Sequence, residues 1–160
     1  MFGKRCNILL FNISVFLSTF AFTGRFPIAP GTVGSFIAVL LAWPILMKFG
    51  VLGLATATII IFIVGVWAVD IYQTHTGAND GNEIVIDEVA GQWLTLLVAS
   101  LDIVHLGIGF LLFRLFDIWK PWPICWVDFN LKGGFGVMAD DILAGFYALV
   151  CLWLLQQTGI

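Results

Sequence analysis

Long apolar runs, separated by short polar stretches, limit the fold of this sequence more than any other feature. The runs lie at about 8–22, 36–49, 51–69, 89–101, 103–116 and 142–155. Almost every charged residue falls between them, in a chain that is 61% hydrophobic and only 11% charged. The mean hydropathy of +1.04 lies far above that of soluble domains and is typical of a protein embedded in a bilayer.

The lengths of the runs predict the kind of membrane fold. Only 51–69 reaches the ~20 residues that cross a ~30 Å hydrocarbon layer. The other runs must borrow flanking residues, tilt or stop partway, and no strand pattern predicts a membrane barrel. We therefore expect one all-α domain over residues 1–160, a compact membrane bundle of about four spanning helices plus short broken or interfacial helices. Residues 1–22 form an interfacial or re-entrant helix, a span or a cleaved signal segment, and the sequence does not choose among these.

Passing the runs back and forth across a membrane brings three polar stretches, 23–35, 70–88 and 114–141, to one face. Lys48 and Asp102 fall on the opposite face. The shared face carries four of the basic residues, namely Arg25, Arg114, Lys120 and Lys132. This imbalance predicts that the shared face is cytoplasmic. The net charge of −3 and the absence of a basic stripe exclude a nucleic-acid-binding protein.

Two pairs of adjacent carboxylates stand at the edges of apolar runs. Asp87 and Glu88 lie within E-I-V-I-D-E-V-A-G, and Asp140 and Asp141 directly precede the run 142–155. Adjacent carboxylates repel each other and resist desolvation, so a shared cation explains both pairs. For Asp140 and Asp141, favourable placement at a helix N-terminus is the alternative. Ligand sets made only of carboxylates favour Mg²⁺ over zinc or copper.

Further acids and a phosphate-suited segment accompany these pairs. Asp80 is a candidate ligand, whereas we expect Glu83 to be peripheral. The segment P-G-T-V-G-S at 30–35 precedes an apolar run, so Gly31, Thr32 and Ser35 would offer a helix start to a phosphate. The alternative is an ordinary helix cap formed by Ser35 or Thr32.

A ridge of charged residues precedes Pro121. Arg114, Asp117 and Lys120 recur at i, i+3 and i+6, which places them along one side of a helix. As a functional group they would bind phosphate and metal. The alternative is a self-contained Arg114–Asp117 bridge beside an interfacial belt of tryptophans.

Four segments together resemble the phosphatidylglycerophosphatase A family of integral membrane lipid phosphatases. They are P-G-T-V-G-S at 30–35, D-G-N-E-I-V-I-D-E-V-A-G at 80–91, F-R-L-F-D-I-W-K-P-W-P-I at 113–124 and G-G-F-G-V-M-A-D-D-I-L-A-G at 133–145. They occur in family order and, with the intervening helices, cover roughly residues 20–150. The resemblance implies Mg²⁺-dependent hydrolysis of phosphatidylglycerophosphate to phosphatidylglycerol and phosphate. This reaction of phospholipid biosynthesis would take place at the cytoplasmic face of the bacterial inner membrane.

The residues and the resemblance together give a set of expected roles. Catalytic residues are Asp87, Glu88 and Asp141. Ligands of one or two Mg²⁺ ions come from Asp80, Asp87, Glu88, Asp117, Asp140 and Asp141. Phosphate is bound by Gly31, Thr32, Ser35, Arg114 and Lys120. Water is the expected nucleophile, and the sequence leaves open which carboxylate is the general base, how many ions bind and the oligomeric state.

Two rival functions use the same residues differently. In a cation- or proton-coupled transporter, carboxylates inside the membrane would form an ion path. That function predicts acids deep in several spans and a repeated half, and the sequence shows neither. In an assembly protein, the acid pairs would bind basic segments of a partner, with no need for a phosphate-suited helix start.

Overall fold

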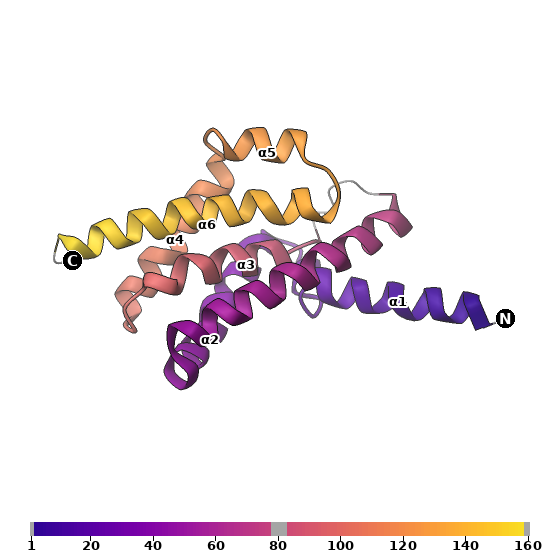
Figure 1. Cartoon of the computed structure of the whole chain (residues 1–160), viewed down its shortest axis with the longest axis horizontal. Helices are drawn as coiled ribbons and strands as arrows, with labels where there is room; N and C mark the ends of the chain where they lie inside the picture. Colours follow the sequence, from indigo (N-terminus) through magenta and orange to yellow (C-terminus); the bar gives the residue numbers. More distant parts are fainter. Residues whose placement is uncertain (1, 78–82, 159–160) are drawn as a thin grey trace.

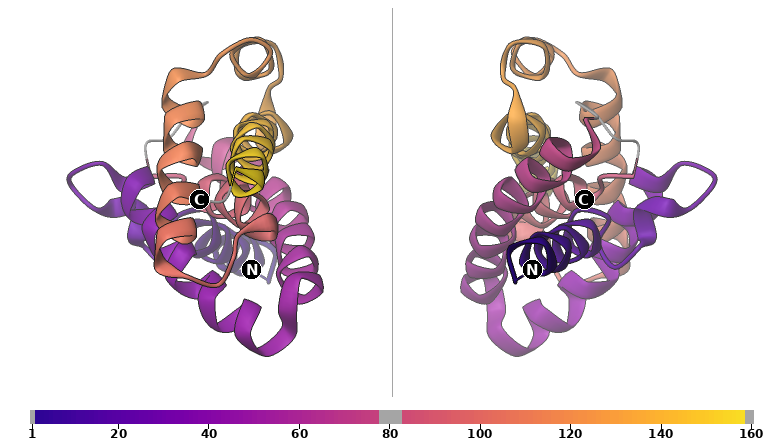
Figure 2. Two further views of the ribbon diagram at one scale, coloured as in Figure 1. Left: turned by 90° about the vertical axis from the view of Figure 1, so that its left-hand side faces the viewer. Right: turned by 90° about the vertical axis from the view of Figure 1, so that its right-hand side faces the viewer.

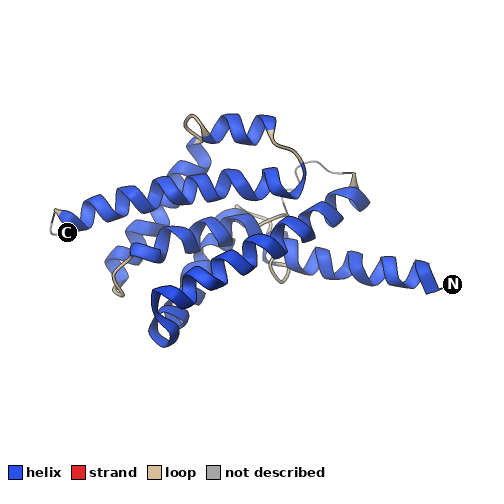
Figure 3. Cartoon of the chain, in the orientation of Figure 1, coloured by secondary structure: helices blue, strands red, loops and turns tan. Residues whose placement is uncertain are grey.

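A computed structural model describes residues 2–77 and 83–158 of the chain. Every regular element in these residues is a helix (Figure 3). In chain order the elements are α1 (Phe2–Ser18), the 3-10 helix η1 (Thr23–Arg25), α2 (Pro30–Thr76), α3 (Ile86–Thr95), the 3-10 helix η2 (Leu96–Val98), α4 (Ile103–Trp119), α5 (Ile124–Asn130) and α6 (Gly133–Gln157). The all-α prediction is therefore confirmed for the described part of the chain.

Gly50 divides α2 into two arms. Its φ of 65° and ψ of −167° interrupt the helix, and this left-handed backbone region favours glycine. Figure 2 shows the two arms meeting in a V at the bend. The break confirms the predicted separation of the runs 36–49 and 51–69. The first arm, however, begins at Pro30 rather than near residue 36, because proline suits the first position of a helix.

In the part of the chain that the structure describes, two helices, α2 and α6, are long and apolar enough to cross a membrane. The four spanning helices predicted are thus only partly supported. The run 89–101 does not form a long helix, because α3 ends at Thr95 and η2 follows it. The ten residues of α3 extend only about 15 Å, half of the hydrocarbon thickness.

The short helix α3 lies at the centre of the bundle. It packs against α2, α4 and α6, and Figure 1 shows it between α2 and α6. Most of its side chains are buried, including Val89, Ala90 and Trp93. The indole Nε1 of Trp93 donates a hydrogen bond to the Ala38 carbonyl at 2.9 Å, which fixes α3 to the first arm of α2. Both acids of the first turn of α3 are therefore carried on a firmly held element.

Candidate functional site

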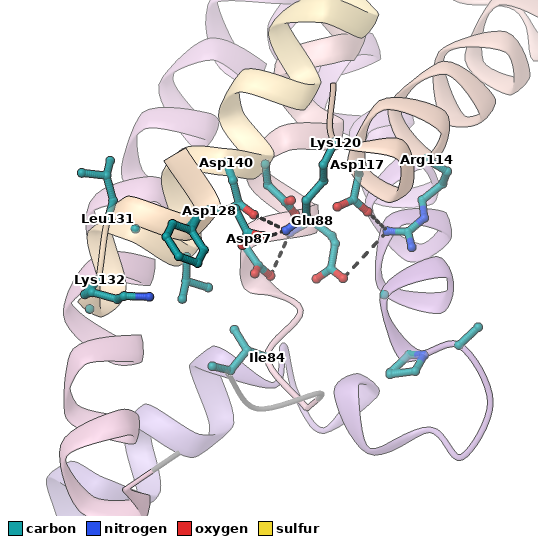
Figure 4. A pocket seen from close by; sticks show the side chains of 18 residues that line it. Ile84, Asp87, Glu88, Arg114, Asp117, Lys120, Asp128, Leu131, Lys132 and Asp140 are labelled. Carbon is teal, nitrogen blue, oxygen red and sulfur yellow. Dashed lines mark hydrogen bonds and ion pairs between the residues drawn. The ribbon is translucent and has the colours of Figure 1, made fainter. Parts of the chain in front are cut away.

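A polar cavity of about 540 Å³ opens where four helix ends meet. Its walls come from the start of α2, the first turn of α3, the end of α4 and the segment from α5 into α6 (Figure 4). The polar stretches 23–35, 70–88 and 114–141 all contribute to it, as the threading of the runs predicts. The cavity lies within the size range of small-ligand sites.

Three carboxylates from two helices converge in this cavity. Asp87, Glu88 and Asp141 each offer an oxygen, and these oxygens all lie within 4.8 Å of one another. A second oxygen of Glu88, Oε2, and Oδ2 of Asp141 are buried and have no hydrogen-bond partner. Buried carboxylate oxygens without donors are unfavourable unless a cation satisfies them, and an all-oxygen set suits Mg²⁺. The predicted meeting of the two acid pairs is confirmed for Asp87, Glu88 and Asp141.

The acids of α6 do not sit at the start of that helix. Because α6 begins at Gly133, Asp141 lies about two turns inside it. The favourable effect of a helix N-terminus on negative charge is confined to about the first turn. Complementation of the helix dipole, the alternative for Asp140 and Asp141, is therefore wrong.

Glycines allow α3 and α6 to approach closely enough to bring the acids together. A Cβ placed on Gly91 would lie 2.4 Å from the Asp141 carbonyl oxygen, and one on Gly145 would lie 2.3 Å from the Gly91 carbonyl oxygen. Thr95 Oγ1 bridges the two helices, with the Gly91 oxygen at 3.0 Å and the Gly145 oxygen at 3.2 Å. The distance between Asp141 and the acids of α3 thus depends on direct contact between the backbones of α3 and α6.

Replacing Gly91 by Ala tests this dependence. The added methyl group would also meet a Phe113 ring carbon at 2.5 Å, so the helices must separate. We expect a loss of about 1–3 kcal/mol in unfolding free energy, measured by thermal unfolding in detergent, and a loss of activity. Gly107→Ala on α4 is the control, because its Cβ meets nothing within 4 Å. Equal stability of the two variants would contradict the close approach.

Arg114 binds the outer acids of the cavity. Its Nη1 lies 2.5 Å from Asp117 Oδ2 and 3.8 Å from Glu88 Oε1. The same nitrogen reaches the buried Ser35 hydroxyl at 3.4 Å. The Arg114–Asp117 bridge of the alternative interpretation is present and lines the cavity, while binding of phosphate or metal by the ridge stays a prediction. Asp117, predicted as a metal ligand, is outside the cluster of three convergent acids.

The predicted phosphate segment enters the site through its backbone. A Cβ on Gly31 would lie 2.0 Å from Glu88 Oε1, so the first turn of α2 rests directly on that carboxylate. Thr32 and Ser35 do not line the cavity, and Ser35 Oγ donates to the Gly31 carbonyl at 2.8 Å. The N-cap of α2 is Ala29, without a side-chain cap, so the capping role proposed for Ser35 or Thr32 is wrong.

Lys120 joins α5 to α6. Its ammonium lies 2.9 Å from Asp128 Oδ1 and 2.6 Å from Asp140 Oδ2. Burial lowers the pKa of Lys120, but the two carboxylates more than offset this and the pKa rises above its ordinary value. Asp140, predicted as a metal ligand, thus directs one oxygen to Lys120, while its Oδ1 is buried without a hydrogen bond.

The acids of α3 are strained electrostatically. Burial raises the pKa of Glu88 well above its ordinary value, and the charges of Asp87 and Asp117 raise it further, while Arg114 lowers it. Burial also raises the pKa of Asp87, although hydrogen bonds with Glu88 act in the opposite direction. These shifts mean that the cluster favours either bound protons or a bound cation.

The remaining predicted residues lie elsewhere, and some cavity residues escaped prediction. Asp80 lies outside the described residues. Glu83 pairs with Arg25 at 3.2 Å on the surface, which confirms its peripheral position. Asp128, Phe129 and the side chain of Lys132 line the cavity without having been assigned a role. The only sequence signal for Asp128 is that it is a single acid within an aromatic stretch.

A family model and two similar proteins point to the same family. The model of the family described as phosphatidylglycerophosphatase A matches residues 16–156. Two similar proteins carry that name. The protein from Escherichia coli K12 is 38% identical over 83% of this chain and 77% of its own length, and that from Haemophilus influenzae Rd is 36% identical over 80% and 79%.

A third similar protein, from Bacteroides thetaiotaomicron, bears a name that provisionally assigns it phosphatidylinositol-3-phosphatase activity. It is 34% identical over 88% of this chain and 91% of its own length. No solved structure matches the chain significantly.

Proposed function

The chain belongs to the phosphatidylglycerophosphatase A family, and from this membership we propose that it hydrolyses the terminal phosphate ester of phosphatidylglycerophosphate to give phosphatidylglycerol and inorganic phosphate. The observation that carries the proposal is the meeting of Asp87, Glu88 and Asp141 in a cavity that also holds Arg114 and Lys120. Such a site combines oxygen ligands for a divalent cation with cations that face a phosphate.

The glycerol headgroup is part of the proposal. Two of the similar proteins are named for phosphatidylglycerophosphate, whereas the Bacteroides protein is named for an inositol lipid. Both lipids present a phosphate monoester on a polyol that a phosphodiester links to diacylglycerol. We assign the glycerol lipid because the family match and two of the named relatives agree on it.

Asp87, Glu88 and Asp141 would hold Mg²⁺, since they form the cluster with unsatisfied buried oxygens. Bound there, Mg²⁺ would polarise the phosphate and lower the pKa of a coordinated water. Asp140 and Asp117 would not bind the ion directly. They pair instead with the two cations at the edge of the cluster, Asp140 with Lys120 and Asp117 with Arg114.

The chain's own groups would bind the phosphate and orient its attacker. Arg114 and Lys120 offset negative charge that grows on the phosphoryl oxygens. The N–H group of Gly31, in the first turn of α2 and in the cavity wall, has no partner within the helix and adds a donor. Neither cysteine nor histidine is among the described residues that line the cavity, so a carboxylate would orient a water molecule for direct attack.

We place the cavity at the cytoplasmic side of the inner membrane. The bend of α2, the α3–α4 connection and the C-terminal end lie together on the left of Figure 1, away from the start of α6. The cavity end carries Arg114, Lys120 and Lys132, whereas Lys48 lies near the bend. In this arrangement the arms of α2, together with α4 and α6, are the four spanning segments, and the positive-inside rule sets their orientation.

Phosphate release from phosphatidylglycerophosphate by the purified chain in detergent tests the function. We expect hydrolysis that chelator abolishes and added Mg²⁺ restores, because the acid cluster requires a cation. Continued hydrolysis in chelator would remove the metal from the proposal. A chain that releases no phosphate but carries cations into proteoliposomes would instead be the rival transporter.

A further inference from the structure

The cations that line the cavity differ in how they are neutralised. Arg114 is held by Asp117 and Glu88, and Lys120 by Asp128 and Asp140. Lys132 lines the same cavity, but no carboxylate among residues 2–77 and 83–158 pairs with it. Its ammonium instead lies 5.8 Å from the centre of the Phe129 ring. Among the described residues, Lys132 is therefore the cavity cation that no carboxylate neutralises, so its whole charge can act on a ligand.

Lys132 also lies far from the centre of the proposed chemistry. Figure 4 shows it on the side of the cavity opposite Arg114, with its ammonium turned toward the interior. Lys132 is exposed, whereas Asp140 and Asp141 are only 5% and 4% exposed. The cavity thus has a deep end with the acid cluster and an outer rim that carries this cation.

Exposed aromatic side chains lie next to the outer rim of the cavity. Trp122, Trp126 and Phe129, on and before α5, are 77%, 54% and 77% exposed. Exposed aromatic residues of this kind concentrate at the boundary between lipid and water. A lipid whose terminal phosphate reaches the deep acids must lead its headgroup outward past this rim, where its phosphodiester lies.

We propose that Lys132 binds the phosphodiester of the substrate lipid and so selects lipids that carry a second anionic group beyond the reacting phosphate. This proposal rests on the proposed function. Phe129 holds the ammonium by a cation–π contact and shields one side of it. Lys132 is then a residue of substrate recognition that leaves the chemical step to the acid cluster.

Steady-state kinetics with two competing inhibitors test the proposal. Phosphatidylglycerol carries the phosphodiester but lacks the terminal phosphate, and inorganic phosphate does the reverse. For Lys132→Met we expect about a tenfold rise in KM for phosphatidylglycerophosphate and in the inhibition constant of phosphatidylglycerol, the loss expected for one charged hydrogen bond. The inhibition constant of phosphate and kcat stay unchanged, and Lys132→Arg retains wild-type values.

Lys48→Met is the matched control, because Lys48 is also exposed and lies 5.3 Å from the centre of the Phe49 ring, near the bend of α2. It should change nothing. An unaltered KM in Lys132→Met, or an equal rise in the inhibition constant of phosphate, would overturn the assignment while leaving the function intact. If the wild type hydrolyses phosphatidylinositol 3-phosphate instead, phosphatidylinositol replaces phosphatidylglycerol as the competing lipid, and the same inhibition constants test the role of Lys132. A wild type that hydrolyses no phospholipid monoester would overturn both proposals.

Discussion

Asp141→Asn is expected to lower kcat about a thousandfold and, at the same time, to raise the melting temperature of the metal-free protein. Activity falls because one of the three convergent carboxylates of the proposed metal site becomes a neutral amide, which binds Mg²⁺ less strongly. Stability rises because Asn keeps the shape of the side chain while removing the buried member of three closely spaced acids. A gain of about 1 kcal/mol corresponds to about 2–4 °C for a chain of this size.

Phosphate release and thermal unfolding in detergent, each with chelator and with Mg²⁺, measure these effects. The control is Asp140→Asn, since Asp140, the neighbour of Asp141 on α6, directs an oxygen to Lys120 instead of to the acid cluster. We expect Mg²⁺ to raise the melting temperature of the wild type and of the Asp140 variant, but not of Asp141→Asn. Mg²⁺ stabilisation that survives in Asp141→Asn would place the cation elsewhere.

Arg114→Met is expected to damage both stability and catalysis. Arg114 is 16% exposed and neutralises Glu88 and Asp117, which are 14% and 12% exposed. Removing the cation leaves two nearly buried carboxylates unpaired, which costs about 3–5 kcal/mol. Loss of a cation at the reacting phosphate should also lower kcat by about a hundredfold to a thousandfold.

Arg114→Lys separates these two effects if the methionine variant does not fold. It keeps the charge, and therefore much of the stability, but loses the planar guanidinium that two oxygens can share. The control is Arg25→Met, because the Arg25–Glu83 pair is 52% and 46% exposed and should contribute about 0–1 kcal/mol. Equal unfolding free energies for Arg114→Met and Arg25→Met would contradict the proposed role of burial.

The sequence predicted which residues meet in the site better than it predicted the bounds of the helices that carry them. Adjacent acids are rare in so apolar a chain, and passing the runs back and forth was enough to bring Asp87 and Asp141 to one face. The starts of α2 and α6 were missed because glycine, threonine and serine precede the apolar runs and resemble loops. In the folded chain these small residues belong to the helices. They are small because close contacts, such as that of Gly31 with Glu88, leave no room for larger side chains.

The assignment of partners within the site could not be predicted. Lys120 follows the end of α4, and nothing in the spacing shows that it would bridge Asp128 and Asp140 rather than face a phosphate alone. Likewise, Asp140 and Asp141 are adjacent in the sequence, yet only Asp141 joins the central cluster. Such distinctions depend on how α4, α5 and α6 pack, and this packing involves residues distant in sequence.

The separation of the central acids along the chain has a consequence for biogenesis. The arms of α2 can pair as soon as both have been synthesised, because Gly50 turns the chain back on itself. Asp87 and Glu88 follow soon after, yet α6, which supplies Asp141, is synthesised only after α4 and α5. A nascent chain therefore holds Asp87 and Glu88 before Asp141 is present, and the acid cluster is completed only after α6 has been synthesised.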